Sequence, residues 1–103
     1  MGVAKSRNIA VCESRCEIVV YTDDDCVCAP DWLASIHAEF EADPTVDAVY
    51  GRVIPFGRNE GMVCPCINES AERRVFQGPA IPADVLGGGN NMAFRKRVFR
   101  KVG

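Results

Sequence analysis

The chain has 103 residues, a formal charge of −2 and 48% hydrophobic residues. This composition is typical of a soluble globular protein with one small core, and the near-neutral charge gives no support for nucleic acid as a partner. No apolar run approaches the ~20 residues that span a bilayer, and Met1 to Ala10 lacks the apolar segment of a secretion signal. We therefore expect a cytoplasmic protein, at the membrane face only if a longer parent protein carries a membrane segment.

The cysteines are numerous for this length. They are Cys12, Cys16, Cys26, Cys28, Cys64 and Cys66. Their even number is compatible with disulfides, but nothing else in the sequence indicates secretion. The two C-x-C pairs lack the C-x₂-C spacing typical of zinc sites. Free thiols are the favoured prediction, and the Cys64-Pro65-Cys66 turn has no role that the residues explain.

The first predicted element is a helix over residues 3–15. Ile9, Cys12 and Cys16 have the i, i+3, i+7 spacing of one apolar stripe. The polar residues near its start are most simply interpreted as a solvated face; they are Lys5, Arg7 and Asn8.

Residues 17–25 read EIVVYTDDD. The apolar run predicts a strand over 17–22, buried on both faces as in a parallel sheet covered by helices. Such sheets bind ligands beyond the carboxyl ends of their strands, where this chain has Asp23, Asp24 and Asp25. Carboxylates ionised together favour Mg²⁺ or Mn²⁺, which keeps coordination positions open for phosphate oxygens. The alternative is an acidic turn that only ends the strand and caps the next helix.

A second helix is predicted from Pro30 to the Asp43-Pro44 pair, since proline suits a first helical turn and aspartate followed by proline ends a helix. Its apolar face consists of Trp32, Leu33, Ile36 and Phe40. We favour a core position for Trp32 over a sugar-stacking role. The single histidine, His37, lies off this face and is predicted to be on the surface.

A second strand is predicted over residues 46–54, with Gly51 marking a bulge or a close backbone approach. Together with the preceding strand and helix it forms a β-α-β unit. Residues 55–66 are irregular, and residues 67–77 are consistent with a short helix with a charged face.

The run LGGGNNMAFR occupies residues 86–95. Its glycines let a ligand approach the backbone, and the amides of Asn90 and Asn91 suit hydroxyl-rich ligands. It is not the G-x-G-x-x-G pattern of dinucleotide sites. The alternative is a flexible turn before an edge strand over 91–94. A last helix is predicted to start near Lys96.

Four motifs now stand in order along the chain. They are RNIA at 7–10, EIVVYTDDD at 17–25, PDWL at 30–33 and GGGNNMAFR at 87–95. Together they resemble a family 2 glycosyltransferase of the GT-A fold, over nearly the whole chain. The resemblance implies a Rossmann-like, three-layer α/β/α arrangement with a mostly parallel sheet, of which residues 1–103 form the central part.

The resemblance also implies the roles of site residues in an inverting sugar transfer. Asp23 and Asp25 would hold Mg²⁺ or Mn²⁺ on the diphosphate of a nucleotide-sugar donor, and Asp24 would lie near the ribose. Arg7 and Asn8 would belong to the donor pocket. The residues bordering the sugar and an acceptor of unknown identity would be Gly87, Gly88, Gly89, Asn90 and Asn91.

The sequence departs from the family pattern at both ends. The family's first strand is missing before Met1, and its general base is expected beyond Gly103. These residues alone are therefore expected to lack transferase activity, and the uncovered sheet edges favour homo-oligomers.

Two readings from other classes compete with a glycosyltransferase fragment. One is a non-catalytic α/β module that binds metal or a partner protein. The other is a phosphoryl-transfer receiver, which is disfavoured because the aspartates are contiguous and no later strand supplies a lysine in the expected manner.

Overall fold

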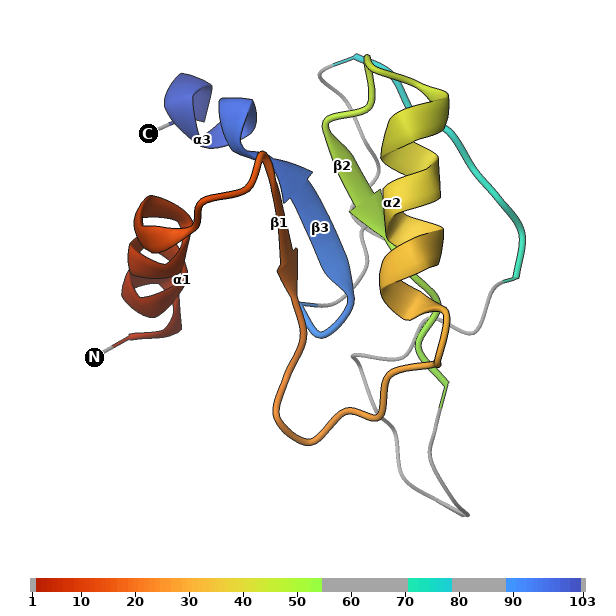
Figure 1. Ribbon diagram of the computed structural model, residues 1–103, viewed down its shortest axis with the longest axis horizontal. Helices are drawn as coiled ribbons and strands as arrows, with labels where there is room; N and C mark the ends of the chain where they lie inside the picture. The colour runs from red at the N-terminus through yellow and green to blue at the C-terminus, as the bar shows by residue number, and fades with distance from the viewer. Residues whose placement is uncertain (1, 55–70, 79–88, 103) are drawn as a thin grey trace.

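The computed structural model describes residues 2–54, 71–78 and 89–102 (Figure 1). In chain order its elements are α1 (Val3–Glu13), β1 (Ile18–Tyr21), α2 (Trp32–Ala42), β2 (Ala48–Tyr50), β3 (Met92–Arg95) and α3 (Lys96–Val102). The predictions made for Cys64, Cys66, Gly87 and Gly88 lie outside the described residues. None of the described helices is long and apolar enough to cross a bilayer.

The described strands form one sheet in the order β1-β3-β2. β3 pairs antiparallel with both neighbours, so that Ala93 lies opposite Val20 on one side and Val49 on the other. β1 and β2 therefore run in the same direction, as a β-α-β unit requires, but β3 separates them. The expectation of a mostly parallel sheet is wrong for the described strands, and the alternative that placed residues 91–94 at an edge is wrong as well.

One face of the sheet is covered by α2. Ile36 and Phe40 of this helix form the buried core with Ala93, whose side chain is fully buried at the middle of the central strand. Val20 and Val49, the partners of Ala93 in the register, pack against the same core. A small residue at the centre of β3 leaves room for the Phe40 ring, which is 2% exposed.

The opposite face carries α1 and α3. Side chains alternate along a strand, so Tyr21 and Phe94 point away from α2. The Tyr21 hydroxyl donates to the Arg7 carbonyl of α1 at 3.3 Å, and the Phe94 ring packs edge-on against Phe99 of α3 with centroids 5.7 Å apart. The three layers expected from the sequence are present, with α1 and α2 on opposite sides of the sheet (Figure 1).

The predicted apolar stripe of α1 is wrong, because Ile9, Cys12 and Cys16 are all exposed. The buried residue of this helix is Val11. Hydrogen bonds to backbone carbonyls also attach this helix and its C-cap to the rest of the fold. Lys96 Nζ donates to the Ser14 carbonyl at 2.9 Å, and the Tyr21 hydroxyl donates to the Arg7 carbonyl.

Three other predictions overestimated burial or regular secondary structure. Leu33 is 61% exposed, although it was assigned to the apolar face of α2. In β1 only Val19 is buried, so this strand is not buried on both faces. Residues 71–77 contain no helical turn; instead Arg73 reaches across to Glu39 of α2 at 3.0 Å.

The C-terminal end of α2 is fixed by Arg95, the last residue of β3. Its guanidinium donates to the Phe40 and Val46 carbonyls at 2.7 Å each, and lies 5.0 Å from the Phe40 ring centre. The helix ends at Ala42 with Asp43 as its C-cap, as the Asp43-Pro44 pair predicts. The Asp43 carboxylate accepts bonds from the Thr45 hydroxyl and N–H, which lower the pKa of Asp43. The Arg95 bond to the Phe40 carbonyl satisfies one of the carbonyls that a helix end leaves unpaired.

Candidate functional site

A tight turn follows β1. The Cys26 N–H donates to the Asp23 carbonyl at 3.2 Å, which closes the turn over Asp24 and Asp25. One side-chain ligand atom each from Asp23, Asp25 and Cys26 lie within 4.8 Å of one another. Asp24 is exposed and is not part of this group. The turn therefore places the two carboxylates that the sequence assigned to a metal close together.

The donor set of this group suits a hard cation through its two carboxylates. Mg²⁺ is commonly bound by one or two carboxylates, with waters and substrate phosphates in its other positions. The Cys26 thiol, which donates weakly to Asp25 Oδ1 at 3.7 Å, is a soft ligand and does not suit Mg²⁺. Asp23 and Asp25 would hold the cation, with Cys26 beside them.

Among the described cysteines the free-thiol prediction is confirmed. Cys12, Cys16, Cys26 and Cys28 are all free.

A pocket of about 320 Å³ lies between α1 and the carboxyl end of β1. Its lining residues are Val3, Ser6, Arg7, Ala10, Tyr21, Thr22 and Asp23. The charged side chains among them are Arg7 and Asp23, one of each sign. The acid turn and a cationic side chain from α1 thus border the same hollow.

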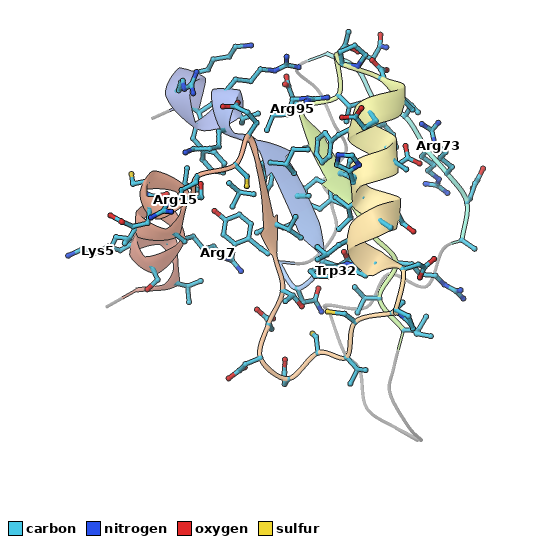
Figure 2. The ribbon with its side chains drawn as sticks, in the orientation of Figure 1. Lys5, Arg7, Arg15, Trp32, Arg73 and Arg95 are labelled. Atoms are coloured by element: carbon cyan, nitrogen blue, oxygen red, sulfur yellow. The ribbon has the colours of Figure 1, made fainter. Side chains whose placement is uncertain are left out.

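Arg7 is the half-buried member of the polar residues at the start of α1. Figure 2 shows its side chain extending from α1 toward β1, whereas Lys5 points away from the sheet. The Arg7 guanidinium lies 5.5 Å from the Tyr21 ring centre and donates to the Gly89 carbonyl at 3.4 Å. The interpretation as a solvated face holds for the exposed Lys5 and Asn8 but is wrong for Arg7.

Tyr21 contacts Arg7 at two points, through its ring and through its hydroxyl. Burial raises the pKa of Tyr21, and the nearby Arg7 charge opposes part of that rise. The phenol therefore stays protonated near neutral pH and can donate to the Arg7 carbonyl.

The part of the glycine-asparagine run that the structure describes is Gly89 to Asn91. Asn91 Oδ1 accepts from Trp32 Nε1 at 3.0 Å, and Asn91 Nδ2 donates to the Arg52 carbonyl at 2.9 Å. The Gly51 N–H donates to the Asn91 carbonyl at 3.0 Å, and a Cβ on Gly51 would collide with the Asn91 amide. A close approach at Gly51 was predicted and is observed, but to the Asn91 side chain. The prediction of a strand over residues 46–54 with Gly51 inside it is wrong, because β2 ends at Tyr50.

Asn90 differs from its neighbour in its hydrogen bonding. Its Oδ1 is buried and has no hydrogen-bond partner among residues 2–54, 71–78 and 89–102. Leaving a buried acceptor unpaired has a cost in free energy, so this atom is available to a donor from a ligand.

Two features of the site were not found from the sequence. Tyr21 was assigned only to the strand, although a phenol two residues before an acid cluster is a usable signal for a pocket wall. The Trp32–Asn91 hydrogen bond joins residues 59 positions apart, and no local pattern predicts it.

The sequence profile described as Glycosyl transferase family 2 matches residues 1–103. Comparison with the curated proteins and with the solved structures gives no match. The profile match spans every motif on which the resemblance was based, from Arg7 to Arg95. The chain therefore belongs to glycosyl transferase family 2.

Proposed function

We propose that this chain binds a nucleotide-sugar donor for inverting transfer of the sugar, of hexose type, to an acceptor hydroxyl. Family membership supports the glycosyltransferase function. The observation that carries the donor proposal is that the carboxylates of Asp23 and Asp25 lie close together at the end of β1. Asp23 and Arg7 line the pocket beside them.

The charges of this site suit a diphosphate. In the proposal, Asp23 and Asp25 would hold a cation that the diphosphate also binds, and the Arg7 guanidinium would donate to diphosphate oxygens. A divalent cation held there would neutralise the charge that develops on the leaving nucleoside diphosphate. Because the two carboxylates are exposed, we expect Mg²⁺ or Mn²⁺ alone to bind weakly and the diphosphate to complete its coordination.

The remaining assignments of the site follow the resemblance. Asp24 is proposed to face the ribose, and Asn8 to border the donor pocket. Gly87, Gly88 and Gly89 are proposed to border the sugar, together with the two asparagines after them. The unpartnered Asn90 Oδ1 supports this assignment, because it can accept a hydrogen bond from a sugar hydroxyl.

Inverting transfer needs a base for the acceptor hydroxyl. The carboxylate that lines the pocket is Asp23, which the proposal assigns to the cation. We therefore propose that the base lies outside the described residues, and we choose binding rather than turnover as the test.

The first prediction concerns metal-dependent nucleotide binding. Calorimetric titration with UDP, GDP, ADP and CDP, each with and without Mn²⁺, should show at least one nucleotide that binds only when Mn²⁺ is present. Asp25→Asn should lower that affinity at least tenfold, because a neutral amide is a much weaker ligand than a carboxylate for a hard cation.

Glu13→Gln is the matched control for this variant. It also removes one exposed carboxylate, but from the end of α1 that precedes β1, and it should leave the affinity unchanged. Equal losses in both variants would contradict the assignment of the cation to the acid turn. Failure of wild type to bind any of the four nucleotides would favour a non-catalytic module instead.

A further inference from the structure

We infer that Gly89 and Tyr21 are positioning residues, which hold the Arg7 guanidinium at the wall of the pocket that Asp23 shares. The inference rests on the proposed function and extends it to residues that touch Arg7. It predicts that substitutions at these positions weaken diphosphate binding through Arg7 while leaving the acid turn intact.

The Arg7 side chain is held from two sides. The Tyr21 ring lies 5.5 Å from the guanidinium carbon, within the range of a cation–π contact, and the Gly89 carbonyl accepts from Arg7 Nη2 at 3.4 Å. A third contact, from the Tyr21 hydroxyl to the Arg7 carbonyl, fixes the helix backbone from which the side chain extends. An arginine side chain has many rotamers, and these contacts restrict it to the pocket side of α1.

The Arg7 guanidinium occupies the space that a side chain at position 89 would need. A Cβ at this position would lie 2.5 Å from Arg7 Nη2 and 3.2 Å from the guanidinium carbon. The atoms that it would meet belong to the far end of a flexible side chain, so an added methyl group would move the guanidinium and not the backbone.

The backbone itself does not require glycine at this position. Among the described glycines only Gly78 has a positive φ, so alanine is compatible with the conformation of residue 89. Replacement by alanine at such a site commonly leaves stability unchanged or raises it slightly, since it restricts the unfolded chain. Gly89→Ala is therefore a substitution that displaces Arg7 without unfolding the protein.

The test is a double-mutant cycle on Gly89 and Arg7, read as affinity for the nucleoside diphosphate with Mn²⁺. Arg7→Ala and Gly89→Ala should each lower the affinity about tenfold, because a charge-assisted hydrogen bond to phosphate is lost. The double variant should be no weaker than Arg7→Ala alone, since Gly89 acts only through Arg7. Affinity for Mn²⁺ alone should change less than twofold.

Gly2→Ala serves as the control, because it adds the same methyl group where nothing lies within 4 Å. Its affinity should equal that of wild type. The thermal midpoint of each variant checks that the fold is retained. Losses that add in the double variant, or an unchanged affinity in Gly89→Ala, would overturn the inference while wild-type binding still supports the proposed function. Absence of binding in wild type would overturn both.

Tyr21 is tested by two substitutions that separate its ring from its hydroxyl. Tyr21→Phe keeps the cation–π contact but loses the hydrogen bond to the Arg7 carbonyl, so it should lower the nucleotide affinity less than Tyr21→Leu does. Tyr21→Leu removes the ring and should lower it about threefold or more. Equal affinities of these two variants would overturn the role assigned to the ring.

Discussion

Asn91 joins segments that lie far apart in the sequence, although its amide side chain in a glycine-rich run suggested a residue that faces a ligand. Both ends of its side-chain amide are engaged, one by the Trp32 indole and the other by the Arg52 carbonyl. Its backbone carbonyl accepts from Gly51. These contacts fix the start of β3 against the first turn of α2 and the end of β2, so that the neighbouring Gly89 is held where Arg7 can reach its carbonyl.

Asn91→Ala is predicted to destabilise the protein by about 1–3 kcal/mol, because the Trp32 N–H loses its partner in a partly buried place. Urea denaturation can be followed by the fluorescence of Trp32, which is the single tryptophan. Asn8→Ala removes the same amide from an exposed position of α1 and should change the free energy of unfolding by less than about 0.5 kcal/mol. Equal stabilities of Asn91→Ala and wild type would show that this hydrogen bond does not stabilise the fold.

At the scale of single residues, the sequence predicts contacts within one turn better than contacts between elements. The three aspartates after an apolar run indicated a cation site, and the turn brings two of them together. Arg7 was first interpreted as solvated because nothing within its helix shows that Tyr21 and Gly89 flank it. The Gly89 contact depends on the pairing of β1 with β3, which are distant in the sequence, and the Tyr21 contact depends on how α1 packs against β1. A local pattern contains neither.

At the scale of elements, α2 shows how an apolar pattern overstates burial. The pattern assigned Leu33 and Phe40 to the same face, but Phe40 is 2% exposed and Leu33 is 61% exposed. The difference arises because Phe40 packs on Ala93 of the central strand. Leu33 lies instead near β1, at the edge of the sheet. Periodicity predicts an apolar side of a helix but not how far the sheet extends beneath it.

The two side chains should therefore respond differently to truncation. Phe40→Ala is predicted to lower the free energy of unfolding by about 3–5 kcal/mol, a large share of the stability of a small domain. Leu33→Ala, in the same helix, should lower it by less than about 1 kcal/mol, because most of the side chain is already in water. Urea denaturation of both variants measures the difference. Similar losses would mean that Leu33 is covered in solution by a part of the protein outside the described residues.

At the scale of the whole molecule, the position of β3 explains why the sheet was predicted only in part. The sequence predicted two strands of the same direction joined by a helix, and β1 and β2 do run in the same direction. It could not predict that residues 92–95 insert between them, because strand order depends on long-range pairing and each apolar run is compatible with several neighbours.

The same arrangement makes the last strand necessary for the rest of the described fold. β1 pairs with β3 and β2 pairs with β3, and among the described strands the two are not paired with each other. The core that Ile36 and Phe40 form is completed by Ala93 of β3, and Arg95 of the same strand bonds the end of α2. Loss of β3 would therefore separate β1 from the unit of α2 and β2, and would expose the core of that unit.

A chain that ends at Asn91 is accordingly predicted to lack a cooperative unfolding transition, although it retains most of the residues and every member of the acid turn. A chain that ends at Arg100 keeps β3 and loses the exposed Lys101 and Val102, and it should unfold cooperatively with a midpoint close to that of wild type. Circular dichroism during urea denaturation compares the two. If the chain ending at Asn91 unfolded cooperatively, β1 and β2 would have to pair directly, in the parallel arrangement that the sequence alone predicted. In that case the Mn²⁺-dependent affinity for the nucleotide should fall about tenfold, as predicted for Gly89→Ala, because Gly89 would no longer be held by β3 against Arg7.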